Sequence, residues 1–322
     1  MPSLIAVAGK RMSSTTPQVT GESPQARTRN GVITGLIAFC SWGFLPIYFK
    51  YLQAVPAAEV LAHRIVWSVP FGALIILARS QWPEVRSIFE NRRTLSLLAL
   101  SALFIALNWL VYVWAVQNSQ IFQASLGYYI NPLMYVLIGV FFFQEQLRRL
   151  QIAAIVLAAV GVAVLTFSGG QFPWISIVLA VSFTIYGVVR KHTEVGGMPG
   201  LFTETLILAP FALGFLGFLL QTGHSSFSSS SLAFDALLML AGPFTVVPLL
   251  CFALAARRLQ LSTIGIMQFI APSLQFLVGI AYGEALTLAH IICFACIWTA
   301  VFVFSWDAWR HSRSQVPMPA VS

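Results

Sequence analysis

The two halves of this chain carry the same pattern of residues, with their arginines at opposite ends. Each copy contains, in order, an aromatic residue, a glycine, a proline, a glycine and a glutamate: Trp114, Gly127, Pro132, Gly139 and Glu145, then Phe252, Gly265, Pro272, Gly279 and Glu284. The first copy has its arginines after the glutamate, at Arg148 and Arg149, whereas the second has them near its start, at Arg257 and Arg258. A duplicated unit with exchanged basic ends is expected to insert in a membrane in opposite orientations.

Composition places the chain in a lipid bilayer. Of its 322 residues, 58% are hydrophobic and 9% charged, and the mean hydropathy is +0.83. Soluble domains average about 25% charged residues. Apolar stretches near twenty residues recur, which is the length that crosses about 30 Å of hydrocarbon as a helix. The alternation of polar and apolar residues that a membrane barrel requires is missing. We therefore expect an all-α integral membrane protein.

The apolar stretches and the basic residues together predict the topology. Ten transmembrane helices are expected at 31–49, 58–78, 95–117, 122–143, 150–168, 173–189, 200–220, 232–254, 262–282 and 287–306. Nearly all of the 18 lysines and arginines fall in the terminal segments and alternate loops, with Lys50 and Arg64 as the exceptions. The positive-inside rule then predicts a multi-pass protein of the bacterial cytoplasmic (inner) membrane with both termini cytoplasmic.

Ten spans divide into two inverted five-helix repeats, because an odd number of spans reverses the second copy. The predicted units are a disordered cytoplasmic tail at 1–29, a first repeat at 30–168, a second repeat at 169–310 and a cytoplasmic tail at 311–322. The stretch 82–93 is expected to lie on the membrane surface as a short amphipathic segment.

Two other classes of partner are not indicated. The net charge of +8 lies in loops that would face anionic lipid, so nucleic acid is not expected. Cys293 and Cys296 have the spacing of metal ligands, but no second pair or histidine cluster completes a site. The cysteines are expected to pack as small apolar residues, and neither a metal nor another cofactor is expected.

Ionisable residues interrupt the span 58–78 near its predicted outer end. Glu59 and His63 are four residues apart and share a helix face, and Arg64 follows them. Because charged groups in lipid are costly, each is a functional candidate. The three residues are interpreted either as a proton-sensing or substrate-anion site, or as an interfacial ion pair that locks the helix end.

Glu204 lies at the start of the span 200–220, at its predicted cytoplasmic end. One interpretation is a proton acceptor or cation contact at an inner gate. The other is a first-turn carboxylate that the helix dipole favours.

Amides and prolines break the apolar pattern at matched places in the two halves. Four amides lie within predicted spans: Asn108, Asn131, Gln268 and Gln275. Amides at this depth commonly bond neighbouring helices. Asn131 and Gln268, however, lie near the repeated Pro132 and Pro272, which free backbone carbonyls and permit bending. The prolines are predicted hinges, and broken helices in matched positions mark candidate binding sites.

Aromatic residues accompany these amides. Trp42 precedes Gly43 in the first predicted span, and Tyr186 precedes Gly187 in the sixth, with Tyr128 in the fourth. They are interpreted either as the lining of a cavity for an apolar or aromatic solute, or as packing beside a glycine notch.

At this point the residues resemble the RarD family, in the EamA group of the drug/metabolite transporter superfamily. The resemblance covers about residues 30–310 and rests on strings that match in order: Trp42-Gly43, Val55-Pro56-Ala57, His63-Arg64, Asn108-Trp109, Ala124-Ser125-Leu126-Gly127-Tyr128, Asn131-Pro132-Leu133, Tyr186-Gly187, Glu204-Thr205 and Val247-Pro248-Leu249-Leu250-Cys251-Phe252. It implies a ten-helix inner-membrane permease, and other members of the superfamily commonly exchange a solute for protons.

The leading hypothesis is a secondary transporter that exports small metabolites or drugs by alternating access, with protons as a candidate coupling ion. No nucleotide-binding motif suggests ATP coupling. A lipid or lipid-linked solute flippase is the alternative. A membrane-embedded enzyme is disfavoured because no catalytic motif occurs. The expected partners are a small-molecule substrate and the bilayer, and the residues indicate no particular oligomeric state.

Overall fold

The computed structural model describes residues 24–143, 148–168, 172–228, 231–259 and 261–314. Within these residues the regular structure is helical: α1 (Pro24–Tyr51), α2 (Ala57–Ala78), α3 (Trp82–Glu90), α4 (Arg92–Gln117), α5 (Ile121–Phe143), α6 (Arg149–Phe167), α7 (Trp174–Lys191), α8 (Gly197–Gln221), α9 (Leu232–Met239), α10 (Ala241–Ala256), α11 (Leu261–Met267), α12 (Ile270–Ala281) and α13 (Leu288–Ser314).

The all-helical membrane class is confirmed. Among the described residues, nine helical segments are long and apolar enough to cross a membrane, and they match nine of the ten predicted spans. The short helices α9 and α10 together form one of them, Leu232–Ala256. The remaining predicted span, 122–143, coincides with the 23-residue helix α5, which is not among the nine.

Both terminal helices extend into segments expected to be tails. α1 begins at Pro24, within the predicted tail 1–29, and proline suits a first helical turn because its missing N–H would be unpaired there. The Arg27 side chain also donates to the Arg257 carbonyl oxygen at 3.2 Å, which ties this turn to the end of α10. α13 continues to Ser314. Residues 1–23 and 315–322 lie outside the described part of the chain.

The predicted surface segment is also a helix. α3 connects α2 to α4 and buries Val85 and Ile88, while Arg86 and Glu90 remain exposed and form an ion pair at 3.0 Å. The side chain of Asn91 accepts from the backbone N–H groups of Arg93 and Thr94, which caps α4 directly afterwards. The chain therefore passes from the surface helix into α4 through a capped helix start.

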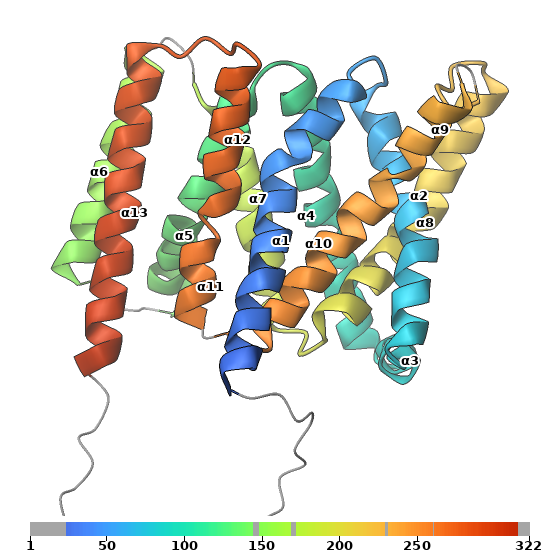
Figure 1. Cartoon of the computed structure of the whole chain (residues 1–322), viewed down its shortest axis with the longest axis horizontal. Helices are drawn as coiled ribbons and strands as arrows, with labels where there is room; N and C mark the ends of the chain where they lie inside the picture. Colours follow the sequence, from blue (N-terminus) through green and yellow to red (C-terminus); the bar gives the residue numbers. More distant parts are fainter. Residues whose placement is uncertain (1–23, 144–147, 169–171, 229–230, 260, 315–322) are drawn as a thin grey trace, which may run out of the picture.

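The helices pack in pairs that mix the two halves of the chain (Figure 1). α6 packs on α13 at one end of the molecule, and α2 packs on α8 at the other. Between them, α4 packs on α7 and α1 packs on α10. α5 contacts α7, while α12 contacts α1. Helices from both halves therefore surround the middle of the bundle.

Glycines permit close approaches between several of these helices. A Cβ atom on Gly161 of α6 would lie 2.8 Å from the Cβ atom of Cys296 on α13. A Cβ atom on Gly43 of α1 would lie 2.6 Å from the Cβ atom of Leu274 on α12. Small residues let membrane helices approach closely enough for dispersion forces to hold them, because lipid provides no hydrophobic drive for association.

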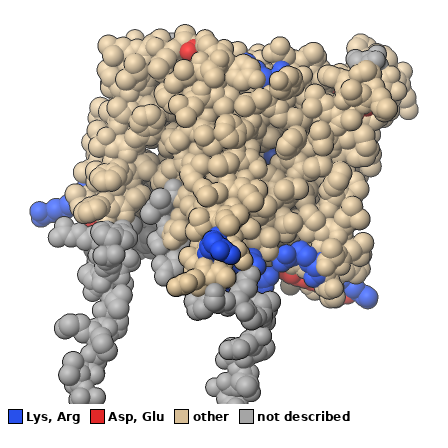
Figure 2. All heavy atoms as spheres, in the orientation of Figure 1, with Lys and Arg blue, Asp and Glu red and all other residues tan. Residues whose placement is uncertain are grey.

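Basic side chains are concentrated along one edge of the molecule. Most lysine and arginine atoms visible in Figure 2 lie along its lower edge, which is also where α1 begins and α13 ends in Figure 1. Between the edges the surface is apolar, with exposed side chains such as Leu74, Phe211 and Phe302. We call the lower edge in Figure 1 the basic side.

The opposite end is sealed by the largest apolar cluster of the bundle. It joins α1, α2, α4 and α5 to α7, α9 and α12, and it includes Leu52, Val60, Val116 and Leu238, each at most 1% exposed. Next to this cluster, the Glu284 carboxylate accepts from the first backbone N–H groups of α5 at 2.6 and 2.9 Å. Burial raises the pKa of this carboxyl, against the opposing effect of the two hydrogen bonds.

Candidate functional site

A cavity of about 830 Å³ opens between helices of both halves. It extends along α2 from Arg64 to Arg79, which is about 22 Å at 1.5 Å per residue. Nine of the sequence-predicted residues line it: Trp42, Arg64, Asn108, Tyr128, Asn131, Tyr186, Gln268, Pro272 and Gln275. Its volume is in the range of about 300–1,000 Å³ that is typical of small-molecule sites.

The cavity opens on the basic side. Its lining there includes Gly197, Ala256 and Arg257, which are exposed at the ends of α8 and α10. At the other end, the lining residues Arg64 and Tyr112 are 4% and 3% exposed, and the apolar cluster lies beyond them. The cavity is therefore accessible from one face of the membrane and closed toward the other.

Arg64 is a buried cation at the closed end. Its Nε atom donates to the Thr245 hydroxyl at 2.7 Å, and its guanidinium lies 4.1 Å from the ring centre of Trp109. Nη1 of Arg64 has no hydrogen-bond partner. The ion pairs among the described residues do not include Arg64. Arg64 therefore contributes a buried positive charge to the cavity lining.

Asn108 and Tyr128 connect three helices beside the cavity. The Asn108 amide donates to the Leu179 carbonyl and the Ser182 hydroxyl, each at 3.0 Å, and accepts from the Tyr128 hydroxyl at 3.0 Å. The interhelical role predicted for membrane amides is therefore confirmed for Asn108, which lines the cavity as well.

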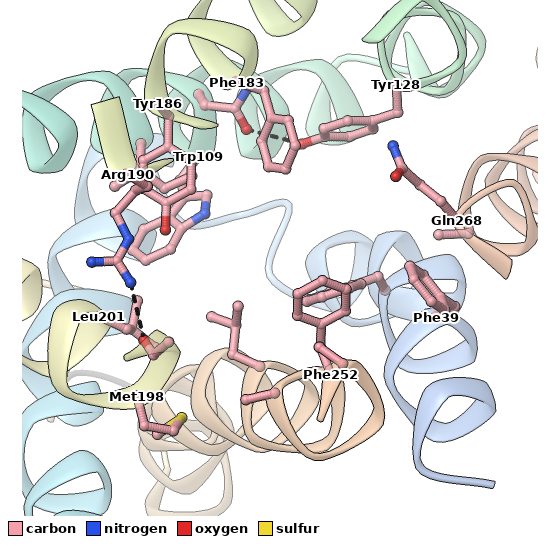
Figure 3. Close-up of a pocket in the computed structure, with 18 of the residues that line it drawn as sticks. Phe39, Trp109, Tyr128, Phe183, Tyr186, Arg190, Met198, Leu201, Phe252 and Gln268 are labelled. Atoms are coloured by element: carbon pink, nitrogen blue, oxygen red, sulfur yellow. Dashed lines mark hydrogen bonds between the residues drawn. The ribbon is translucent and has the colours of Figure 1, made fainter. Parts of the chain in front are cut away.

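The second-half amides lie on or beside an interrupted helix. α11 ends at Met267 and α12 begins at Ile270, so the break falls at Gln268, which projects toward the cavity (Figure 3). Gln275 donates to the Trp42 carbonyl at 3.1 Å, which orients its amide, and its Oε1 atom has no partner. The carbonyl oxygen of Pro272 accepts from the Ser125 hydroxyl at 2.8 Å.

The matched prolines differ in their effect. The helix breaks four residues before Pro272, whereas α5 continues through Pro132 without interruption. A proline removes one backbone donor, and neighbouring groups often satisfy the freed carbonyl, so a membrane helix tolerates it. Pro132 is also outside the cavity lining, although its neighbour Asn131 lines the cavity and has an unpartnered Oδ1 atom.

Glu59 and His63 do not line the cavity. The Glu59 carboxylate accepts from the Ser226 backbone N–H at 2.6 Å and from its hydroxyl at 2.8 Å. His63 lies 4.0 Å from Glu59, accepts from the Trp67 ring N–H and contacts the Phe227 ring at a tilted angle. Glu59 and His63 therefore connect the start of α2 to the loop that follows α8.

Glu204 belongs to a buried polar cluster near the cavity mouth. α8 begins at Gly197 rather than at 200, so Glu204 lies about 10 Å inside the helix and is not a first-turn residue. Its carboxylate accepts from Ser101 at 2.6 Å and from Tyr186 at 3.5 Å, and it pairs with Arg190 at 3.6 Å. Glu204 is not part of the lining itself, but Tyr186 and Arg190 are.

Several lining residues were not among the sequence-predicted candidates. Trp109, Phe183 and Phe252 contribute aromatic walls that surround an open centre in Figure 3. Arg190 and Arg257, interpreted from the sequence only as topology signals, also line the mouth. Their positions at helix ends were readable from the sequence, but the direction of their side chains depends on how α7 and α10 pack.

The described residues contain no group of three or more histidine, cysteine, aspartate or glutamate side chains that could hold a metal ion. Cys293 is buried, and its backbone lies against Gly161 of α6. Cys296 approaches the same glycine. Both cysteines therefore contribute to the packing of α6 on α13.

Comparisons with known proteins agree with this architecture. Residues 29–167 match the EamA-like transporter family. A transporter of Pseudomonas aeruginosa is 44% identical over 91% of this chain and 99% of its own length. Protein RarD of Salmonella typhi is 42% identical over 90% of this chain and 99% of its own length. Protein RarD of Escherichia coli is 40% identical over 88% of this chain and 96% of its own length.

A solved crystal structure shares the fold, with a TM-score of 0.54 and 20% identity over 86% of this chain and 97% of that one. These three relatives are identical to the chain at 40% or more of the aligned positions over nearly their whole lengths. The chain therefore belongs to the EamA-like transporter family, among its RarD proteins, and is a membrane transporter.

Proposed function

We propose that this protein is a secondary transporter that exports small metabolites or drugs by alternating access. The observation that carries the proposal is the cavity, which is shared by both halves, open on the basic side and closed toward the other. A transporter must expose one site to each face in turn, and a cavity open to one face is one of the two states that this requires.

We further propose that the chain consists of two inverted five-helix repeats, about 30–168 and 169–310. The pairing of helices supports this division. If α1, α2, α4, α5 and α6 correspond to α7, α8, α10, α12 and α13, then the contact of α4 with α7 corresponds to that of α1 with α10. The contact of α5 with α7 likewise corresponds to that of α12 with α1. Rocking one repeat against the other would then close the mouth and open the sealed end.

The proposed orientation places the basic side and both termini in the cytoplasm, according to the positive-inside rule. The open cavity then faces the cytoplasm, where an exporter would collect its substrate.

This orientation predicts which face of the membrane reaches the cavity. In a variant whose four native cysteines are replaced by alanine, Ala256→Cys should react with a membrane-impermeant maleimide in inside-out vesicles and not in right-side-out vesicles. The reason is that Ala256 is exposed and lines the mouth. Labelling is measured by the gel shift of the modified protein.

Tyr282→Cys is the matched control, because Tyr282 is 45% exposed and follows α12 at the opposite end. It should be labelled only in right-side-out vesicles. The reverse pattern for both variants would overturn the proposed orientation, and labelling of Ala256→Cys from both faces would contradict a sealed end.

Proton coupling is proposed to involve Glu204 rather than His63. Glu204 contacts Tyr186 and Arg190, which both line the cavity. A change in the protonation of Glu204 would therefore change the electrostatic potential that acts on a bound solute. His63 is engaged by Glu59, Trp67 and Phe227 outside the cavity.

Glu204→Gln is therefore expected to abolish the acceleration of transport by an imposed pH gradient, whereas His63→Gln should retain it. The measurement is flux of chloramphenicol and a panel of metabolites in proteoliposomes with and without the gradient. Each variant is first checked for a single symmetric peak in size-exclusion chromatography. Unchanged pH-driven flux in both variants would remove Glu204 from the coupling mechanism.

A further inference from the structure

We infer that the substrate is an aromatic organic acid whose anionic group binds Arg64 at the closed end of the cavity. This inference rests on the proposed function and specifies the chemical class of the cargo.

Arg64 lacks the counter-ion that its burial calls for. Burying a charge costs several kcal/mol unless it is paired. The guanidinium has one hydrogen bond, from Nε to Thr245, and the Trp109 ring covers one of its faces. A cation–aromatic contact contributes about 2 kcal/mol when it is desolvated, which offsets only part of this cost. Nη1 remains without a partner, and an anion in the cavity would complete the set.

The charge of the lining favours anions at the mouth and at the closed end of the cavity. Four arginines line it, Arg64, Arg79, Arg190 and Arg257, against a single carboxylate, Glu84. Glu84 already accepts from the Gly196 backbone N–H at 2.7 Å. Nε of Arg79 and Nη1 of Arg190 are buried without partners. Charges of one sign in a cleft with apolar walls concentrate ions of the opposite sign, so the mouth would draw anions toward Arg64.

The side walls of the cavity indicate the chemical character of the rest of the substrate. Between the mouth and Arg64, aromatic side chains line the cavity on two sides, with Trp109, Tyr128 and Phe183 on one side and Phe39 and Phe252 on the other (Figure 3). Flat rings bind such surfaces through stacked or edge-to-face contacts. An aliphatic acid would leave these contacts unused.

The same cavity presents a hydrogen-bond acceptor. Gln275 is 3% exposed, and its amide nitrogen is held by the Trp42 carbonyl, so its Oε1 atom is left without a donor. A hydroxyl or amino group on the ring would supply that donor. The inferred ligand therefore carries an anion at one end and a donor elsewhere on its aromatic body.

The test is a comparison of 4-hydroxyphenylacetate with its neutral amide, 4-hydroxyphenylacetamide, on the purified full-length protein in detergent. Binding is measured by thermal shift and by quenching of tryptophan fluorescence. The acid should bind, and the amide should bind about 10- to 100-fold more weakly, since a hydrogen bond to a charged group contributes about 1.5–3 kcal/mol. Arg64→Gln should weaken binding of the acid by a similar factor and leave that of the amide unchanged.

Arg86→Gln is the matched control, because it removes one arginine that is 77% exposed on α3 and is not part of the cavity lining. It should bind the acid as the unmodified protein does. If Arg64→Gln does not give a single symmetric peak in size-exclusion chromatography, Thr245→Val replaces it. That variant keeps the charge but removes the hydrogen bond that orients it, and it should weaken acid binding several-fold.

Three results would overturn the inference. They are equal binding of the acid and the amide, acid binding that survives Arg64→Gln, and no binding of either compound at millimolar concentration. None of these results would affect the cysteine-labelling pattern, which tests the transporter proposal separately. Failure of the substrate class is therefore distinguishable from failure of the proposed function.

Discussion

Replacing Gly242 by alanine is expected to prevent α2 and α10 from closing on each other. A Cβ atom at this position would lie 2.5 Å from the carbonyl carbon of Trp67 and nearer still to its oxygen. Backbone atoms cannot rotate away as a side chain does, so the two helices must separate. Overpacking typically costs about 1–3 kcal/mol, and we expect the upper end of this range. The measurement is the thermal midpoint in detergent, with the yield of monodisperse protein.

Gly214→Ala is the matched control in a neighbouring helix. A Cβ atom there would meet nothing within 4 Å, and the residue is exposed within α8. Alanine is favoured over glycine in a helix by about 1 kcal/mol, so this variant should be as stable as the original or more so. Equal stability of Gly242→Ala and Gly214→Ala would mean that the approach of α2 to α10 is not essential to the fold.

The second large effect is expected for Glu204→Ala. Arg190 and Glu204 form an ion pair in which the side chains are 13% and 1% exposed. Removing one member of a buried pair leaves the other charge uncompensated and costs about 3–5 kcal/mol. The hydrogen bond from Ser101 is lost as well. The difference in the free energy of unfolding is measured by denaturant titration in mixed micelles, after a check that the protein refolds.

An exposed pair on the same molecule provides the comparison. Arg86 and Glu90 are closer, at 3.0 Å, but their side chains are 77% and 65% exposed. Exposed pairs contribute about 0.2–1 kcal/mol, so Glu90→Ala should be nearly neutral. The double variant Arg190→Met with Glu204→Ala should recover much of the loss, because no charge then remains unpaired. If Glu204→Ala lowers the free energy of unfolding by no more than Glu90→Ala does, then burial does not increase the contribution of the Arg190–Glu204 pair to stability.

Helix positions were predictable from local sequence because length and apolar content suffice to define a membrane helix. The boundary of α10 at Ala256 was predicted within a few residues, since Arg257 and Arg258 follow it directly. The start of α8 was predicted less well. Gly197, Pro199 and Gly200 resemble a loop in sequence, yet they form its first turn, because Pro199 suits a helix N-terminus.

The site was predictable only in part, and span 58–78 shows why. The sequence places Glu59, His63 and Arg64 on one helix and indicates that Glu59 and His63 share a face. Arg64 lies about 100° around the helix from His63. Which of the two faces meets a cavity depends on the helices that pack against each of them. α10 supplies Thr245 beside Arg64, while the loop after α8 supplies Ser226 beside Glu59.

Apolar stretches long enough to span a bilayer determined from the sequence alone that this is a multi-helix membrane protein. The exchanged arginines of the two halves are the sequence feature from which we propose inverted repeats. Those properties are local, because each helix satisfies its own backbone hydrogen bonds. Only the tertiary structure decided that Arg64 is unpaired and faces the cavity, while Glu59 and His63 hold a loop. A side chain's electrostatic role depends on the neighbours that other helices supply, and those neighbours are distant in sequence.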